Sequence, residues 1–202
     1  MDQLLKLLDA NFDDAEGSLR IVDADWFGDD LKLSVSIQCH NDHDPELWEI
    51  ACGGVVEESL SAVTSGELTV STDSPLLRMF VEPQVQIMFA GNALAAEALL
   101  GIVCSCCMEV MGRAETITRF MNGAPTVKGI ASSAYGLLGE FPQSLAEQIL
   151  KALDQKPIQA HALTGWLPVK WDGAQRVSYP RLQIVEIGTS YVIAEQFSAC
   201  RA

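Results

Sequence analysis

Alternation between apolar and polar residues is clearest in residues 31–39. Leu31, Leu33, Val35, Ile37 and Cys39 are separated by Lys32, Ser34, Ser36 and Gln38. This period of two residues predicts a half-buried β-strand. The link Gly28-Asp29-Asp30 joins that strand to the segment 18–27, and a link of this length favours a hairpin.

Shorter strand patterns follow at 46–52, 67–71 and 85–91. Together with the hairpin they predict that the amino-terminal part of the chain forms an antiparallel meander with one solvent-facing side. Later segments at 157–163 and 165–171 are typical of edge strands, and 181–200 predicts a hairpin that turns at Gly188–Ser190.

Helical patterns occur at residues 2–9, 92–114 and 142–155. In the long segment 92–114, the few polar or small residues recur every four positions as Glu97, Gly101, Ser105, Glu109 and Arg113. A helix that is apolar on its other sides is buried on most sides, so we expect it to lie across the sheet. Segment 142–155 is amphipathic, with proline at its first turn.

These elements predict an α+β fold. Its sheet is mainly antiparallel, built from an amino-terminal meander and a carboxy-terminal hairpin, and it packs against a long buried helix and a second amphipathic helix. The chain has 202 residues, and no internal repeat or low-complexity linker divides it. We therefore expect a single domain over residues 1–202, in which residues 1–130 and 131–202 can form sub-lobes.

The formal net charge is −14, and residues 1–50 hold 13 acidic but only 3 basic side chains. Such a field repels nucleic acids and anionic lipids and attracts basic proteins, although solubility is a simpler explanation. The start of the chain lacks the pattern of a secretory signal, and no segment has the composition of a membrane span. We therefore expect a cytoplasmic protein with free thiols, whose sulfur atoms lie inside the fold.

The segment 39–44, Cys-His-Asn-Asp-His-Asp, is the densest group of candidate metal ligands. Cys39, His40, His43 and Cys52 have the chemistry of a zinc site. However, both cysteines continue the apolar faces of predicted strands, so their thiols are expected in the core. The favoured interpretation is a polar turn without a cofactor, and a metal site at His40 and His43 stays as the alternative.

Other candidates have simple structural explanations. Cys104 and Cys107 share one face of the long helix but lie in its middle, where cysteine behaves as a small hydrophobic residue. His161 lies in an apolar segment and is expected in the core. Trp166 and Trp171 flank a proline in the mildly basic carboxy-terminal part. They form either an exposed recognition rim or an edge strand packed on the core.

The sequence thus supports two hypotheses of different class. The first is a non-catalytic protein that binds a basic partner, with a profile similar to bacterial toxin-neutralising (immunity) proteins in composition and layout only. Its predicted acidic contact residues lie on neighbouring strands and turns of the meander: Asp23, Asp25, Asp29, Asp30, Asp42, Asp44, Glu46 and Glu49. Trp166 and Trp171, in the carboxy-terminal part, are added to the predicted contact residues as the recognition rim. The alternative is a metal-dependent hydrolase or other enzyme centred on Cys39–Asp44. The sequence does not indicate an oligomeric state.

Overall fold

A computed structural model describes residues 1–13, 15–40, 44–62, 64–91, 95–112, 117–121 and 133–202. The chain divides into two compact units. The first unit joins Met1–Leu77 to Pro180–Ala202, and the second is Arg78–Tyr179. These boundaries differ from the expected division between residues 130 and 131, because the carboxy-terminal segment pairs with strands near the start of the chain.

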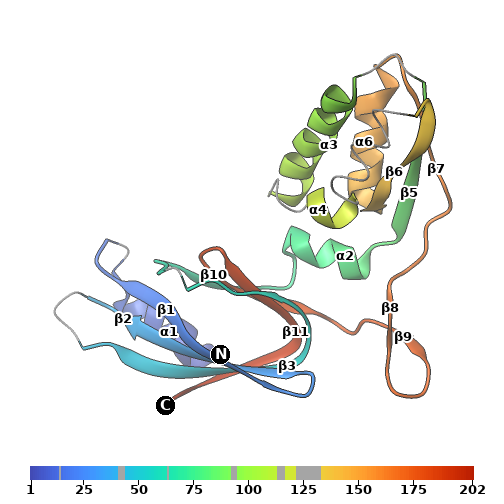
Figure 1. Ribbon diagram of the computed structural model, residues 1–202. Helices are drawn as coiled ribbons and strands as arrows, with labels where there is room; N and C mark the ends of the chain where they lie inside the picture. The colour runs from blue at the N-terminus through green and yellow to red at the C-terminus, as the bar shows by residue number, and fades with distance from the viewer. Residues whose placement is uncertain (14, 41–43, 63, 92–94, 113–116, 122–132) are drawn as a thin grey trace. The chain divides into compact units, whose positions relative to one another are not determined.

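In its described residues, the first unit is a six-stranded antiparallel sheet with helix α1 and a short 3-10 turn (Figure 1). The elements are α1 (Asp2–Asn11), β1 (Ser18–Phe27), β2 (Asp30–Gln38), β3 (Glu46–Ser59), β4 (Leu68–Ser71), η1 (Pro75–Leu77), β10 (Gln183–Ile187) and β11 (Ser190–Arg201). The strand order is β1-β2-β3-β11-β10-β4. The α+β class, the amino-terminal meander β1-β2-β3 and the hairpin at Gly188–Ser190 are therefore confirmed.

The meander in the structure is shorter than the one that the sequence predicts. Strand β4 does not pair with β3, because the hairpin β10–β11 lies between them and β11 pairs along most of β3. Near the start of β1, a backbone bridge joins Leu19 to Ser65, just before β4. The sheet therefore curls far enough that its first strand meets the segment that leads into β4.

The core of the first unit lies on the side of the sheet that α1 covers (Figure 1). The alternating residues Leu31, Leu33, Val35 and Ile37 are all buried, as their spacing predicts. From the helix, Leu4 is completely buried against them. An isolated helix of ten residues is marginal in water, so α1 depends on this packing for its stability.

The second unit contains a three-stranded antiparallel sheet, of order β6-β5-β7, and a separate pair of strands, β8 and β9. Its elements are α2 (Arg78–Val81), β5 (Gln84–Ala90), α3 (Ala96–Met111), α4 (Ile117–Phe120), β6 (Tyr135–Pro142), α6 (Gln143–Asp154), β7 (Gln159–Ala162), β8 (Val169–Trp171) and β9 (Arg176–Ser178). Helix α6 packs on the three-stranded sheet, and α3 packs on α6.

The long apolar helix is thus present, but it does not lie across the meander. Helix α3 belongs to the second unit and packs against the amphipathic helix α6. The polar stripe is on its exposed side, where Glu97, Gly101, Ser105 and Glu109 are all exposed. The stripe therefore predicted which side faces water, although not which element covers the other sides. Within the described ranges, no helix is long and apolar enough to cross a membrane.

Candidate functional site

Three of the predicted contact residues lie on one side of the first sheet, the side opposite α1, which we call the outer face. Asp23 and Asp25 on β1 are opposite Ser34 and Lys32 of β2, and Ser34 is in turn opposite Glu49 of β3. The Nζ of Lys32 lies 3.1 Å from Oε1 of Glu49. This bond raises the pKa of Lys32, and the charges of Glu49, Asp25 and Asp23 raise it further.

A β-bulge decides that Asp23 and Asp25 reach the outer face. Leu19 and Ile21 point toward the core, and a strict period of two would send Asp23 the same way. The register shifts between Ile21 and Asp23, so Val22 is an extra residue and the alternation reverses. Carboxylates that a regular strand would turn toward the core side are therefore placed on the outer face.

The turn between β1 and β2 carries the next two predicted residues, Asp29 and Asp30. The carboxylate of Asp30 accepts a hydrogen bond from the Gly54 N–H at 2.8 Å. The carbonyl of Asp29 accepts one from the Val55 N–H, also at 2.8 Å. The turn is thereby fixed to β3, and the Asp30 side chain has a structural task in addition to its charge.

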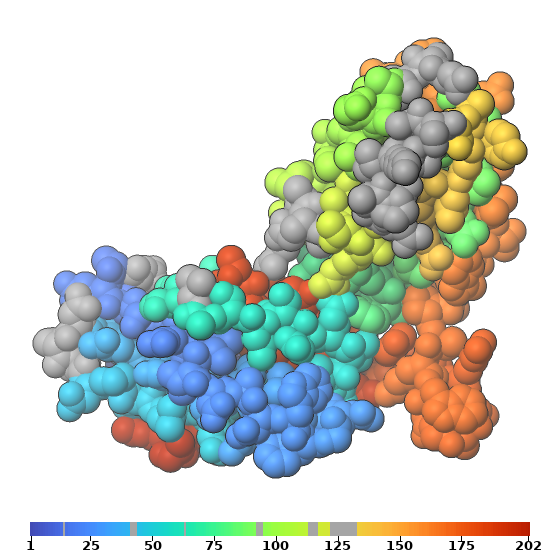
Figure 2. All heavy atoms as spheres, in the orientation of Figure 1, coloured from blue at the N-terminus to red at the C-terminus, as the bar shows by residue number. Residues whose placement is uncertain are grey.

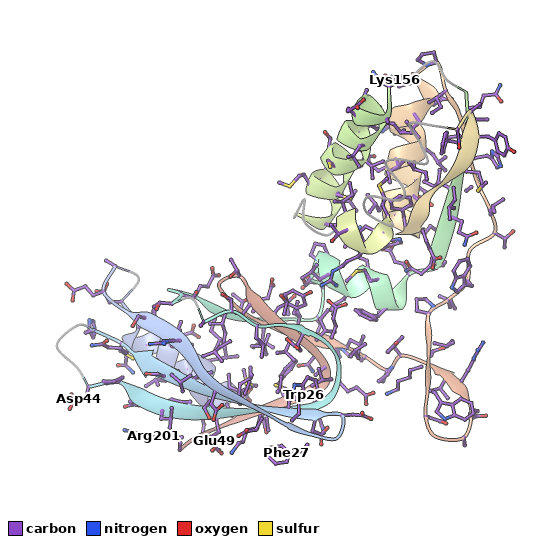
Figure 3. All side chains as sticks on the ribbon, in the orientation of Figure 1. Trp26, Phe27, Asp44, Glu49, Lys156 and Arg201 are labelled. Carbon is purple, nitrogen blue, oxygen red and sulfur yellow. The ribbon has the colours of Figure 1, made fainter. Side chains whose placement is uncertain are left out.

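Two aromatic residues at the end of β1 complete this region. Trp26 is 50% exposed and Phe27 is 63% exposed. Figure 3 shows Phe27 on the same side of the sheet as Glu49, with Trp26 on the other side. We call Asp25, Trp26, Phe27, Asp29 and Asp30 the β1–β2 tip. In the space-filling view, the segment that contains β1 forms part of the surface of its unit (Figure 2).

Sequence reasoning missed Trp26 and Phe27, although a signal was present. Neighbouring residues of a strand point to opposite sides, so two adjacent large aromatics cannot both enter a one-sided core. Their position directly before Gly28 also places them at the end of a hairpin, where few other side chains cover them. An exposed aromatic residue among carboxylates was therefore predictable.

The outer face is also hollowed beside Phe27. A shallow depression of about 480 Å³ is lined by residues that include Phe27, Lys32, Gly53 and Gln196. At Gly53 an added Cβ would lie only 2.7 Å from the side chain of Gln196. The glycine therefore lets the Gln196 side chain lie close over β3 and form part of the lining.

The remaining predicted carboxylates do not join this group. Asp44 is exposed at the opposite end of the sheet from Phe27 (Figure 3). Glu46, near Asp44, is already engaged: its Oε1 lies 3.2 Å from Nη2 of Arg201, and its Oε2 accepts a hydrogen bond from Trp48 Nε1 at 3.3 Å. Asp42 lies outside the described residues.

The described residues do not form a set of ligands for the alternative metal site. The Nδ1 of His40 lies 3.9 Å from Oδ2 of Asp13, and His43 lies outside the described residues. Across the described ranges, no group of three histidine, cysteine, aspartate or glutamate side chains is arranged to hold a metal ion. Cys52 is buried in the core, and burial raises its pKa to about 12. A metal at His40 and His43 stays a prediction.

The cysteines of α3 mostly pack inside the second unit. Cys106 and Cys107 are buried, and Cys104 is half-buried. Burial first, and then the nearby thiols of Cys104 and Cys106, raise the pKa of Cys107 to about 12. A thiol with so high a pKa is a poor nucleophile at neutral pH. Cys200 differs from the expectation of interior sulfur atoms, because it is exposed on β11.

Trp166 and Trp171 lie in the second unit, whereas the carboxylates of the β1–β2 tip lie in the first. Trp166 pairs with Gln84 through two backbone hydrogen bonds, yet 45% of it is exposed. Trp171, on the hairpin β8–β9, is 66% exposed and lies opposite Arg176. The expectation that His161 lies in the core is wrong, because this residue is exposed on β7.

No family model, curated protein or solved structure matches this chain.

Proposed function

We propose that the protein is a non-catalytic, cytoplasmic binding protein that recognises a basic protein partner through the β1–β2 tip and the adjoining outer face. The observation that carries the proposal is the exposure of Trp26 and Phe27 beside Asp25 and Asp29. A partner of this kind includes a basic toxin, which such binding would occlude and neutralise. The assignment of Trp166 and Trp171 to the same function stays a prediction.

The chemistry of the tip suits a protein interface. Interfaces derive most of their binding energy from a few large anchors, among which tryptophan is enriched, and surrounding polar groups supply specificity. Here Trp26 and Phe27 offer apolar area, while Asp25 and Asp29 offer charges that favour lysine and arginine. Carboxylates of one sign also steer an oppositely charged partner and speed its association.

The rigidity of the tip supports the same proposal. A loop that must be ordered on binding loses affinity to the entropy of that ordering. The hydrogen bonds to Gly54 and Val55 hold the turn before a partner arrives. Asp25 is held in a regular ladder with Lys32. The anchors and charges are therefore presented in a fixed arrangement.

Charge reversal with a matched control tests the proposal. The double variant Asp25→Lys, Asp29→Lys changes the tip, and Glu58→Lys, Glu67→Lys changes the net charge equally at exposed residues elsewhere in the same unit. Immobilised protein is used to capture partners from the native host, and each captured protein is then titrated against all three chains. We expect a basic partner whose affinity falls at least about tenfold with the tip variant and little with the control.

Salt provides a second measurement. Raising the ionic strength from about 0.05 M to about 0.5 M shortens the screening length severalfold, so association with the partner should slow markedly. Equal losses in the two double variants, or binding that salt does not change, would contradict the proposal.

A further inference from the structure

We propose that the partner binds by adding an extended basic segment to the free edge of β1, with alternate lysine or arginine side chains beside Asp23 and Asp25. The inference rests on the proposed function and names the form of the partner. It concerns backbone pairing as well as charge, so it can fail while the proposed function holds.

Strand β1 is the first strand of its sheet, and β2 covers only one of its edges. On its other edge the only pairing among the described residues is the bridge of Leu19 with Ser65. Beyond the bulge, Asp23 to Phe27 are all exposed. An exposed edge strand is a template for another extended chain, and peptide recognition by strand addition uses such edges.

The ladder with β2 fixes which backbone groups face outward. The two-residue turn closes on the pair Phe27–Asp30, so Phe27 and every second residue before it bond to β2. The N–H and C=O groups of Trp26 and Ala24 then point to the free edge. The Ala24 N–H is bonded at 2.9 Å to the carboxylate of Asp23, which agrees with this direction. A pairing strand would replace that local bond with a backbone bond.

The side chains of β1 define the sequence that such a strand needs. Asp23 and Asp25 share the outer face, next to Lys32, which is itself bonded to Glu49. Residues directly opposite each other on adjacent strands have Cβ atoms about 5 Å apart. Lysine or arginine opposite Asp25 would extend the row in which Asp25 and Lys32 already alternate in sign. A second base opposite Asp23 would pair with a carboxylate whose other neighbour, Ser34, is uncharged. Between them, apolar residues would lie beside Ala24 and Trp26.

A second copy of this chain is a poor occupant of the same edge. Two β1 strands that pair antiparallel would bring Asp23 and Asp25 of each copy next to those of the other. Like charges opposite each other destabilise a strand pair. Edge charges and bulges are also devices that prevent unwanted pairing. The same carboxylates therefore disfavour self-association and select a basic strand.

Synthetic peptides test the inference with the whole, unaltered protein. One capped peptide of about eight residues alternates lysine with valine, and a second has the same composition with its lysines grouped at one end. We expect the alternating peptide to bind about tenfold more tightly by calorimetry and to slow amide hydrogen exchange at Ala24 and Trp26. Methylating the peptide nitrogens on the edge that pairs with β1 should abolish binding. Methylating those on the opposite edge is the control and should not abolish it.

Variants separate this inference from the proposed function. Ala24→Pro removes an N–H that is not needed for pairing with β2, so we expect the fold to persist and peptide binding to be lost. Asp25→Lys should weaken both the peptide and the basic partner. If neither N-methylation nor Ala24→Pro affects binding while Asp25→Lys does, strand addition is wrong and the proposed function survives. If Asp25→Lys also has no effect on either ligand, both are wrong.

Discussion

The Oδ1 of Asp30 accepts a hydrogen bond from the backbone N–H of Gly54 at 2.8 Å. This contact joins the β1–β2 turn to the third strand at a position where the chain kinks. Gly54 has a positive φ of 64°, in the region that favours glycine. One of the carboxylates expected to contact a partner is therefore also a link within the fold, and its neighbour Asp29 is the better probe of charge.

The two aspartates should respond differently to truncation. Asp30→Ala removes the acceptor for Gly54 N–H and is expected to destabilise the protein by about 1 kcal/mol. In Asp29→Ala the carbonyl that accepts from Val55 N–H is retained, so the free energy of unfolding should change by less than about 0.5 kcal/mol. Urea unfolding of both variants measures the difference. Equal stability of the two would show that the bond to Gly54 contributes nothing.

The six thiols are expected to react in an order set by burial. Cys200 is exposed, whereas burial raises the pKa of Cys52 and of Cys107 to about 12. Only a thiolate reacts readily, so at pH 8 Cys200 should be alkylated first and Cys52 and Cys107 only upon unfolding. Mass spectrometry of the native protein after timed alkylation gives the order. Rapid labelling of Cys52 in the native state would contradict its burial.

Much of the first sheet could be predicted because its signal is local. The alternation at residues 31–39 and the short link at Gly28–Asp30 each report on neighbouring residues, and both gave the observed hairpin. The order of the remaining strands depends on pairing between distant segments. The insertion of β10–β11 between β3 and β4 does not affect the local spacing of apolar residues, so that spacing does not predict it.

The long helix α3 also shows that a local pattern does not identify packing between distant segments. Its polar stripe predicted which side is exposed, because burial of the other sides requires apolar residues there. Periodicity does not say which element covers those sides, so α3 was expected on the meander but packs on α6. At the candidate site, the bulge at Val22 reverses the alternation of β1. A single extra residue decided where Asp23 points.

Leu4 should be essential for the stability of the first unit. It is completely buried between α1 and the sheet, and Leu4→Ala leaves a cavity there. We expect a loss of about 2–5 kcal/mol in the free energy of unfolding. Gln3→Ala, at an exposed position of the same helix, is the control and should be close to neutral. Chemical denaturation of both variants tests this. A small effect at Leu4 would show that α1 does not contribute to the core.

Two turn aspartates should titrate in the acid range. Asp13 accepts hydrogen bonds from the backbone N–H groups of Ala15 and Glu16, and Asp172 from those of Gln175 and Ala174. These bonds favour the charged form, so the pKa of each carboxyl lies below its ordinary value of 3.8. The stability that they contribute is present above pH 3.8 and is lost as the pH falls through the folded pKa.

Carboxyl carbon NMR during an acid titration measures both midpoints directly. Both midpoints should lie below 3.8, the ordinary pKa of an aspartate carboxyl. Midpoints of Asp13 and Asp172 at or above that value would show that the turn bonds do not persist in solution.

The four tryptophans allow the acidic tip to be examined by fluorescence without a known partner. Trp48 is only 6% exposed and should resist all quenchers, while Trp26 and Trp171 are at least half exposed. The net charges of their surroundings differ in sign: Trp26 adjoins Asp25 in the chain, whereas Trp171 lies opposite Arg176 and between Lys170 and Asp172. Local charge concentrates counter-ions. Caesium should therefore quench Trp26 more than Trp171, and iodide should do the reverse.

Single substitutions assign the two signals. Trp26→Phe should remove most of the caesium-sensitive emission, and Trp171→Phe should remove most of the iodide-sensitive emission. Each variant serves as the control for the other, because both replace one exposed indole. High salt should reduce the contrast between the two ions, since screening weakens their attraction to fixed charges. If both ions quench Trp26 equally at low salt, the carboxylates of the tip do not create the negative field on which recognition of a basic partner depends.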